Sequence, residues 1–499
     1  MKVHLYDEKS REDINEGIGS IIKDATRKKL EMLEPNLSER MNITECIKEY
    51  ISKKKRKIYG GWAINALIKA KNEKDAFYTD ISVPDIEFYS PTPIQDLIEI
   101  CNILNEKKFK GVIGKEAQHN ETYTVFVNYE KYCDMTYIPK HVYDGIATII
   151  IDKLQIIKPE WLYIDIFRAL TDPITSYWRL DKTLSRSYLL QKYYPLELVK
   201  YEPTKINMPE GTSGLLSLIY VWLANKRTCI LIGDYGYQYL INDGEVNLSK
   251  IHMFEFISTD FRTDCYELIS KIKQTYSNNI TTEEYYPFFQ FTGHTFCIYY
   301  KKYMVAKIYH YNKKCITYQF QKNEPIENNS LIGSETQQRL RIRNAEASNE
   351  NSKNKGFKIG TYMLILLYFF INEQYNKINR NKKEELKYEY LIYNLVKHRN
   401  SYLKKHNKGI LDDTIFREFT IDCIGVTIDP AREFRENIDK KKMQGKRQYI
   451  YSYDPKSKNN SDPSKFKFLN TSGNLVRKPQ NLKIKMEGVD SIESVATNE

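Results

Sequence analysis

Three acidic side chains in two short apolar segments have the residue types and spacing of a metal site. Asp85 and Glu87 flank an isoleucine, and Asp134 stands between a cysteine and a methionine. Alternate side chains of a strand share a face, so Asp85 and Glu87 point the same way and Asp134 emerges on the polar face of a second strand. If the two strands are neighbours, the three carboxylates converge and repel one another unless cations lie between them.

The cations that suit such a cluster are hard ions with oxygen ligands, Mg²⁺ or Mn²⁺. Two such ions activate an attacking hydroxyl and stabilise a leaving pyrophosphate. We therefore predict that Asp85, Glu87 and Asp134 are both the catalytic residues and the metal ligands.

A glycine pair, Gly60–Gly61, precedes the helix-like stretch WAINALIKA. Glycine lets the backbone approach a ligand closely, and the free N–H groups at a helix start attract an anion. The pair is therefore predicted to hold a triphosphate, with the metal ions on its far side. An ordinary turn is the alternative interpretation of a glycine pair taken alone.

The elements that must position these residues are helices and strands in mixed order. Residues 8–55 have apolar positions at helical spacing, and residues 58–139 contain a strand end, a helix, and a hairpin formed by TYTVFV and YCDMTYI. Residues 146–200 begin strand-like and become helical, and a new unit begins near residue 201. The pattern predicts an α+β protein with a mixed sheet and flanking helices, followed by a second mixed α/β domain.

The second domain has a helix (GLLSLIYVWLANK), a strand (TCILIG), a β-rich region over 288–320 and helices over about 360–405. Residues 322–356 indicate a loop or lid. Its strands carry no ordered carboxylate pair on a polar face, so no second active site is expected there. The four predicted parts are a helical segment (1–55), a catalytic domain (56–200), the second domain (201–435) and a basic, partly disordered tail (436–499).

The chain has 499 residues and a net charge of +12, which favours a polyanionic partner. Its 40 tyrosines supply rings that can stack on unpaired bases. Codon bias of an AT-rich genome is the alternative source of both features.

Eight cysteines are scattered without a Cys-x-x-Cys pair, which argues against zinc and favours buried free thiols in a reducing compartment. The N-terminus has no apolar signal core, so secretion is not expected. The longest apolar run, 362–371, is too short to span a bilayer and is interpreted as a core helix, so no membrane partner is expected.

The ordered set of Gly-Gly, helix, Asp-hydrophobic-Glu and hydrophobic-Asp-hydrophobic resembles the polymerase-β-like nucleotidyltransferase superfamily. Within it, residues 55–430 are similar to the poly(A) polymerases of giant and other large DNA viruses, which are related to the poxvirus catalytic subunit. The segments that carry this resemblance are YGGWAIN (59–65), DIEFYSP (85–91), EAQHNETY (116–123), YCDMTYIP (132–139), DPITSYWRLDKTLSRSYLL (172–190), PFFQFTG (287–293) and NKKCI (312–316).

Two departures from the family pattern affect the assignment of the ligands. Glu87 stands where many members have Asp, and the interval between Gly61 and Asp85 is longer than usual. Asp80 lies in that interval and is the alternative first ligand. We rank it below Asp85 because the residues after Asp80 lack the second carboxylate.

The resemblance implies an ATP-binding role for the segment after Asp172–Pro173. Ser176, Arg179, Lys182 and Arg186 recur at spacings of three to four and are predicted to share a helical face. Lys182 would hold the terminal phosphates, with Ser176 and Tyr177 near the ribose or base. A solvated basic face is the alternative. His119 and Tyr123 are expected to pack beneath the site.

Two further hypotheses concern the second domain and the basic stretch near the C-terminus. Gly211–Gly214 before a helix resembles a nucleotidyltransferase turn, so the second domain is interpreted as a catalytically silent copy of the fold. The stretch 440–467 interleaves Lys and Arg with Tyr449, Tyr451 and Tyr453, which suits RNA. A tail that aids solubility only is the alternative.

The implied activity is template-independent addition of AMP from ATP to mRNA 3′ ends, by in-line attack of the 3′-hydroxyl on the α-phosphate. The expected partners are ATP, an RNA 3′ end, and a second copy of the chain or a processivity subunit. The expected location is cytoplasmic, in the host cytoplasm or viral factory, with packaging in the virion as an option. The alternatives are another acceptor, or a non-catalytic RNA-binding subunit, against which the intact carboxylates argue.

Overall fold

The computed structural model describes residues 7–33, 36–78, 82–119, 121–203, 206–276, 279–322, 356–445, 449–466, 468, 473 and 475–477. The chain divides into two compact units. The first comprises Met1–Tyr137, Thr148–Ile157 and Phe434–Lys467, and the second comprises Ile138–Ala147, Lys158–Glu433 and Phe468–Glu499.

The compact units group the residues differently from the boundaries predicted from the sequence. Residues 158–200 belong to the second unit because α6 (Pro159–Leu170) packs its apolar side on α13 (Tyr362–Ile378), with the rings of Tyr163 and Phe370 5.4 Å apart. The prediction that residues 56–200 together form the catalytic domain stays a prediction.

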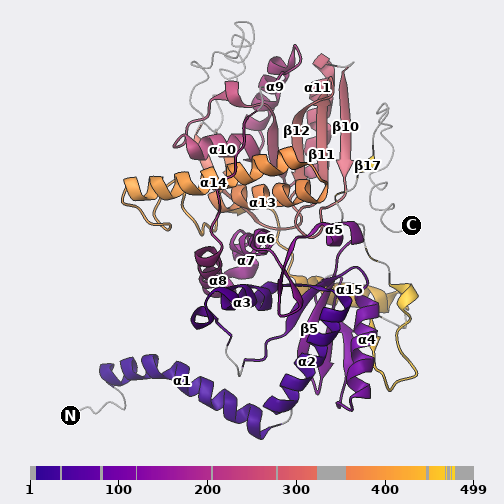
Figure 1. The fold of residues 1–499 in the computed structure, drawn as a ribbon. Helices are drawn as coiled ribbons and strands as arrows, with labels where there is room; N and C mark the ends of the chain where they lie inside the picture. The colour runs from indigo at the N-terminus through magenta and orange to yellow at the C-terminus, as the bar shows by residue number, and fades with distance from the viewer. Residues whose placement is uncertain are drawn as a thin grey trace, which may run out of the picture. The chain divides into compact units, whose positions relative to one another are not determined.

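The first unit is built on a mixed sheet with the order β16-β3-β4-β5-β2-β1-β7-β6 among its described residues. Figure 1 shows α2 and α4 beside β5. The elements are α1 (Glu8–Met32), α2 (Leu37–Lys54), β1 (Lys57–Tyr59), α3 (Gly60–Lys71), η1 (Glu73–Asp75), β2 (Ile86–Ser90), α4 (Pro93–Glu106), β3 (Ile113–Glu116), β4 (Thr122–Val127), β5 (Glu130–Tyr137), β6 (Thr148–Ile151), β7 (Leu154–Ile157), β16 (Ser452–Tyr453) and η6 (Pro463–Lys465).

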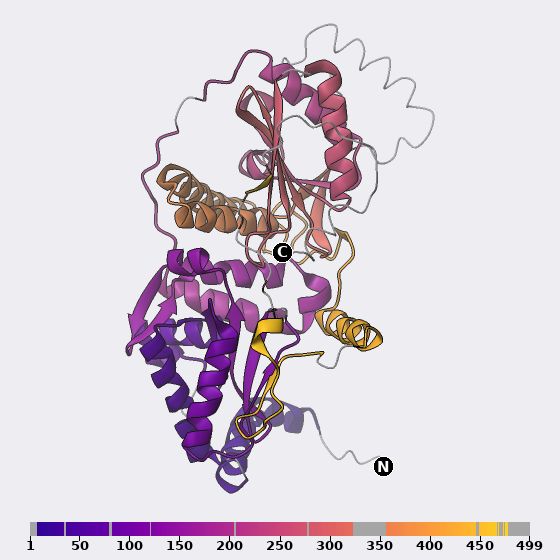
Figure 2. The same cartoon turned by 90° about the vertical axis from the view of Figure 1, so that its right-hand side faces the viewer.

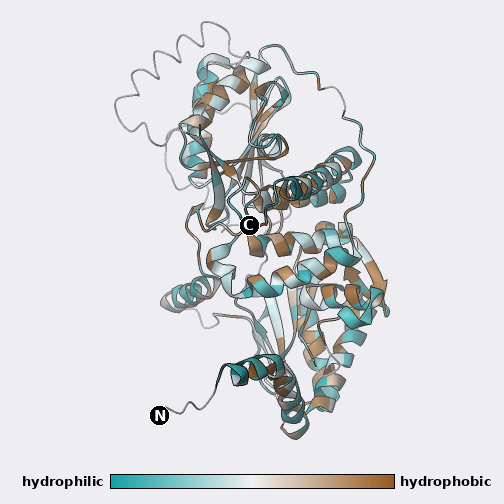
Figure 3. Ribbon diagram, turned by 90° about the vertical axis from the view of Figure 1, so that its left-hand side faces the viewer, coloured by the Kyte–Doolittle hydropathy of each residue, from teal (hydrophilic) through white to brown (hydrophobic). Residues whose placement is uncertain are grey.

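Helix α1 forms as the sequence predicts but buries none of its residues. Its isoleucines stay accessible, with Ile21 and Ile22 62% and 58% exposed, and the helix is mostly hydrophilic in Figure 3. The apolar core of this region begins in α2, which buries Ile43, Ile47 and Ile51.

The basic C-terminal segment returns to the first sheet, where β16 pairs antiparallel with β3 (Figure 2, yellow). Tyr451 has no exposed surface, and its ring meets those of Tyr123 and Phe466 at 5.9 and 5.1 Å. The prediction that Tyr451 stacks on RNA bases is therefore wrong, because this ring fills the core. Residues 478–499 of the predicted disordered tail lie outside the described residues.

Replacing Tyr451 by alanine is expected to destabilise the first unit by roughly 3–5 kcal/mol, the cost of deleting a large buried aromatic side chain. Thermal unfolding, with hydrogen exchange of β3 and β4, measures the effect. Tyr449, which is 36% exposed, supplies the matched control, since Tyr449→Ala should change stability by less than about 0.5 kcal/mol. Equal losses in the two variants would contradict this assignment of the core.

The second unit has a sheet with the order β15-β13-β14-β8-β9-β12-β11-β10-β17 among its described residues. The predicted strand at TCILIG and the predicted helix before it are confirmed as β8 and α9. Its elements are α5 (Lys140–Gly145), α6, α7 (Pro173–Ser176), η2 (Tyr177–Arg179), α8 (Leu180–Tyr193), α9 (Thr212–Ala224), β8 (Cys229–Ile232), α10 (Gly233–Ile241), η3 (Leu248–Lys250), β9 (Phe254–Ser258), α11 (Phe261–Tyr276), β10 (Ile280–Tyr285), β11 (Thr295–Tyr300), β12 (Tyr303–His310), β13 (Ile316–Lys322), β14 (Gly356–Gly360), α13, α14 (Lys382–Lys405), β15 (Cys423–Ile424) and β17 (Leu475–Arg477), and α15 (Pro430–Met443) runs on into the first unit.

The two sheets repeat one topology. The order β3-β4-β5-β2-β1-β7-β6 in the first unit corresponds to β10-β11-β12-β9-β8-β14-β13 in the second, with parallel and antiparallel pairs in the same places. The helices follow the same plan, since α3 and α10 each begin directly after the first strand of the repeat. The second unit therefore repeats the fold of the first, in line with the interpretation of the second domain as a copy of that fold.

The equivalent of the glycine turn lies at Gly233 and not at Gly211–Gly214. Gly233 follows β8, has φ +57°, and begins α10, whereas Gly211 precedes a helix that follows no strand of this sheet. The interpretation of Gly211–Gly214 is thus wrong. A glycine before a helix resembles the motif in sequence, but the motif also requires a strand of the sheet directly before the glycine.

The apolar run 362–371 forms the start of α13, a core helix, as predicted. Glu373 on this helix is only 1% exposed, and Gln374 Nε2 donates to its Oε1 at 2.9 Å. Burial raises the pKa of Glu373 to about 8, against the opposing charge of Lys377. Among the described residues, no helix is both long and apolar enough to cross a membrane.

Glu373→Gln is expected to stabilise the protein increasingly as pH rises from about 4.5 to 8. A folded-state pKa above the unfolded value means that folding favours the protonated carboxyl, so the wild type loses stability through this window. Melting temperatures across the window measure the effect. Glu384→Gln, at a more exposed glutamate of α14, is the control, and parallel pH profiles for the wild type and Glu373→Gln would refute the prediction.

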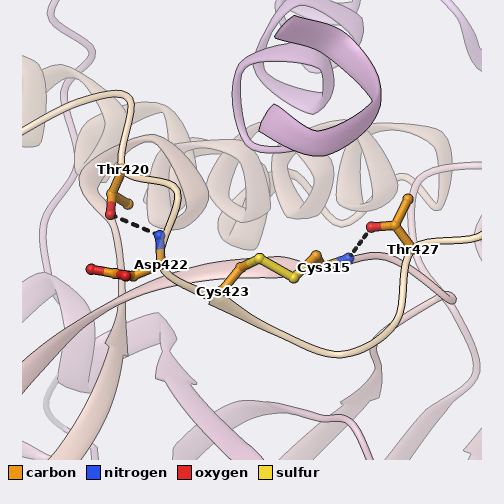
Figure 4. Close-up of a disulfide and its surroundings, with 5 residues drawn as sticks. All are labelled: Cys315, Thr420, Asp422, Cys423 and Thr427. Atoms are coloured by element: carbon orange, nitrogen blue, oxygen red, sulfur yellow. Dashed lines mark hydrogen bonds between the residues drawn. A yellow bond between two sulfur atoms is a disulfide. The ribbon is translucent and has the colours of Figure 1, made fainter.

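Two of the eight cysteines form a disulfide, Cys315–Cys423, with an S–S distance of 2.00 Å (Figure 4). The expectation of free thiols is wrong for this pair, which is separated by 108 residues and meets where β13 pairs with β15. The amide of Cys315 also donates to Thr427 Oγ1 at 2.7 Å. The expectation is confirmed for the six buried thiols Cys46, Cys101, Cys133, Cys229, Cys265 and Cys297.

Candidate active site

The strand-to-helix turn at Gly60 fits closely around a carboxylate. Gly60 has φ +72°, and a Cβ built there would lie 1.8 Å from Glu87 Oε2. The amide of Gly61, the next residue of α3, donates to the same oxygen at 3.1 Å. The first turn of α3 thus presents the N–H of Gly61 to Glu87, and only glycine fits at position 60.

The two acidic segments lie on adjacent strands, as predicted. Strands β2 and β5 pair in parallel, with Glu87 directly opposite Asp134. Cys133 and Met135, on either side of Asp134, are completely buried, which places the carboxylate on the opposite face. Asp134 accepts a hydrogen bond from Thr124 Oγ1 at 2.6 Å, so β4 also fixes its orientation.

A lysine that the sequence reasoning missed joins two of the carboxylates. Lys131 Nζ lies 2.7 Å from Asp85 Oδ2 and 2.6 Å from Asp134 Oδ2. The pKa of Lys131 is raised, because the negative charges of Asp134 and Asp85 outweigh the opposing effect of burial. One cationic group therefore stands where two carboxylates converge.

A β-bulge brings Lys131 to the same face of β5 as Asp134, which the sequence pattern did not predict. Residues 131 and 134 are an odd number apart and would point to opposite faces of a regular strand. The pairing with β4 shifts between Val125 and Phe126, which leaves Tyr132 as an extra residue on β5. The bulge turns Lys131 to the polar face. The sequence does show a basic residue three positions before Asp134. It does not show the bulge that brings this residue to the same face of the strand.

The third carboxylate, Glu87, is held apart from this ion pair. Burial raises the pKa of Glu87 to about 7, and the neighbouring charge of Asp85 adds to the effect, while the hydrogen bond from Gly61 acts against it. Within the described part of the chain, no three His, Cys, Asp or Glu side chains are grouped ready to hold a metal.

These residues nevertheless fit a divalent cation. Their oxygens are the ligand type that Mg²⁺ and Mn²⁺ prefer. The ammonium of Lys131 shows that Asp85 and Asp134 direct oxygens at one shared cationic position. Glu87 would complete the set by turning away from Gly61.

Of the residues predicted to bind ATP, Gly60 and Gly61 lie in the first unit, whereas Ser176, Tyr177 and Lys182 lie in the second. The helix expected over 172–190 is broken into α7, η2 and α8, so Ser176 does not share a continuous helical face with Lys182. Ser176 is buried, whereas Tyr177 is 71% exposed and Lys182 lies on the exposed side of α8. Lys182 and Arg186 are one turn apart on α8 and do share a face.

Three other predicted positions have different outcomes. Tyr123 is buried in the core of the first sheet, as expected. His119 is exposed between β3 and β4, so the expectation that it packs beneath the site is wrong, because the hairpin turn carries it to the surface. Asp80, the alternative ligand, lies outside the described residues.

Comparison with known proteins agrees with this geometry. Residues 45–176 match the family described as the poly(A) polymerase catalytic subunit, and residues 188–486 match the C-terminal part of the APMV poly(A) polymerase catalytic subunit. A relative from Acanthamoeba polyphaga mimivirus, described as a poly(A) polymerase catalytic subunit, is 34% identical over 96% of this chain and 84% of its own. The chain belongs to the viral poly(A) polymerase catalytic-subunit family.

Further relatives of this viral poly(A) polymerase extend the comparison. A catalytic subunit from African swine fever virus (isolate Pig/Kenya/KEN-50/1950) is 31% identical and covers 43% of the chain and 50% of its own length. The crystal structure of the Megavirus polyadenylate synthase superposes with a TM-score of 0.84 at 32% identity, covering 98% of this chain and 95% of that one. The polymerase is therefore a nucleotidyltransferase, as the sequence predicted.

Proposed function

We propose that this polymerase adds AMP from ATP to the 3′ ends of mRNA, with Asp85, Glu87 and Asp134 holding two divalent cations, Mg²⁺ or Mn²⁺. The observation that carries the proposal is the convergence of Asp85 and Asp134 on one cationic group, opposite Glu87 on paired strands. When bound, the metal ions would lower the pKa of the RNA 3′-hydroxyl and neutralise the triphosphate.

The protein's own side chains orient the reacting groups. Thr124 fixes one oxygen of Asp134, which leaves its other oxygen directed at the shared cationic position. Lys131 would release Asp85 and Asp134 when a cation takes its place, and until then its positive charge balances the two carboxylates. The amide of Gly61 at the start of α3, which binds Glu87, would become available to a phosphate once Glu87 turns.

Lys182 is proposed to bind the terminal phosphates of ATP, with Ser176 and Tyr177 at its ribose or base. These roles come from the resemblance of the segment 172–190, and the exposure of Lys182 and Tyr177 supports them. We also propose that the enzyme acts in the host cytoplasm or viral factory, as a homodimer or with a processivity subunit.

Incubation of the full chain with a short RNA, Mg²⁺ or Mn²⁺, and each nucleotide in turn tests the proposal. Extension of the RNA with ATP and a divalent metal is the expected result. Labelling of a protein or small-molecule acceptor without RNA extension would replace it with another nucleotidyltransferase activity. Tight RNA binding without any transfer would favour a non-catalytic subunit.

A further inference from the structure

The second unit has a pocket at the place that corresponds to the active site of the first. In the repeated topology, β9 and β12 correspond to β2 and β5, and Glu255 pairs with Lys307 as Glu87 pairs with Asp134. Glu255 also lies against Gly233 as Glu87 lies against Gly60. Met253 stands in the place of Asp85. Of the three carboxylates only one is kept, and a lysine replaces another.

The face of this sheet has become an open pocket of about 540 Å³, which includes its mouth. Lys307 and Tyr309 from β12, Tyr285 from β10 and Tyr375 from α13 are among the residues that line it. The ring of Tyr375 meets that of Phe288 edge-on at 5.2 Å, which holds it in place.

The chemistry of the lining favours one class of ligand. Several of the lining side chains are aromatic, and stacking of a base on an aromatic side chain contributes roughly 1–3 kcal/mol. Lys307 is the one charged residue among the described residues that line the pocket. It donates to Asn372 Oδ1 at 2.9 Å, which uses one of the three N–H donors of its ammonium.

A single positive charge beside stacking rings matches one nucleotide of an RNA chain, whose phosphodiester carries one negative charge. A free triphosphate carries several negative charges and is poorly matched by one lysine. We propose that this pocket binds an unpaired base of the RNA, with Lys307 contacting a neighbouring phosphate. The inference rests on the proposed function, in which RNA is the acceptor, and gives the second copy of the fold the role of an RNA grip.

The test is equilibrium binding of the full chain to fluorescent oligo(A) at several salt concentrations. Tyr375→Leu removes a stacking ring, so affinity should fall roughly 10-fold with an unchanged salt dependence. Lys307→Gln removes a phosphate contact, so the slope of log K against log salt should become shallower by about 0.7. Tyr375→Phe keeps the ring and should bind as the wild type does, which separates lost stacking from misfolding.

Two surface variants serve as controls. Tyr266→Leu removes a 44%-exposed ring of α11, and Lys302→Gln removes an exposed charge of the turn between β11 and β12. If the pocket variants keep wild-type affinity and salt slope, or lose no more than these controls, the proposal is overturned. Loss of free-ATP binding with unchanged RNA binding would also overturn it.

Addition of a single AMP to a very short RNA is measured in parallel. The pocket variants should keep this activity and lose affinity only for longer RNA. Failure of the wild type to extend any RNA would refute the proposed function itself, and wild-type extension with unaffected pocket variants would refute the RNA grip alone.

Discussion

Asp85→Ala is expected to lower the rate of nucleotide addition on the order of 10³-fold or more, while the protein stays folded. The carboxylate is one of the two that converge on a cationic position, so its loss would remove one of the three proposed metal ligands. Lys131 keeps Asp134 as its partner, and exposed pairs contribute little, so the unfolding free energy should change by less than about 1 kcal/mol. Single-turnover rates with ATP and RNA, together with thermal unfolding, measure the two effects.

The companion variants decide which carboxylates act. Asp134→Ala should be similarly impaired and should lower the rate of the chemical step more than ATP affinity. Asp80→Ala should be mild, and the reverse order of effects would move the site to Asp80. Asp152→Asn is the matched control, because Asp152 is exposed in the turn between β6 and β7 and asparagine accepts its positive φ of 48°. Full activity in all three ligand variants would end the nucleotidyltransferase assignment of this site.

Gly60→Ala should lower activity by at least about 100-fold, because a Cβ at the start of α3 would block the close approach of a phosphate, and small displacements of a reacting group have large kinetic costs. The new Cβ would meet Glu87 Oε2 at 1.8 Å and must push that side chain out of its place. The backbone would also be held at a φ of +72°, which costs roughly 1–2 kcal/mol for a residue with a Cβ. Both the melting temperature and the transfer rate should therefore fall.

Gly17→Ala is the control for this substitution. Nothing lies within 4 Å of a Cβ at Gly17, which stands in the middle of α1. Alanine should stabilise that helix by up to about 1 kcal/mol and leave the activity unchanged. Wild-type activity in Gly60→Ala would show that the turn at Gly60 does not need to admit a phosphate.

The sequence allowed much of the first sheet and its polar face to be predicted. Alternation of apolar residues around Asp85, Glu87 and Asp134 indicated two half-buried strands, and their parallel pairing confirms that prediction. The role of these carboxylates as metal ligands stays a prediction. Strong local patterns of this kind survive folding because each strand must bury one face.

Features that depend on distant or irregular pairing could not be predicted. Lys131 reaches the site through a bulge that no local pattern marks. Strand β16 has only two residues, and its partner β3 lies more than 300 positions earlier. The division of residues 158–200 from the first sheet follows from packing on α13, which periodicity does not reveal.

The pairing of β16 with β3 has a consequence for the order of synthesis. A ribosome that has made the other strands of the first sheet must still translate residues 158–433 of the second unit before Ser452 and Tyr453 emerge. Until then, β3 is an open edge and the space around Tyr123 lacks the ring of Tyr451. Open edges pair readily with other chains, so the nascent first unit is exposed to aggregation for much of translation. The finished sheet thus marks a chain in which residues 158–433 of the second unit have already been made, and premature termination leaves an incomplete first unit.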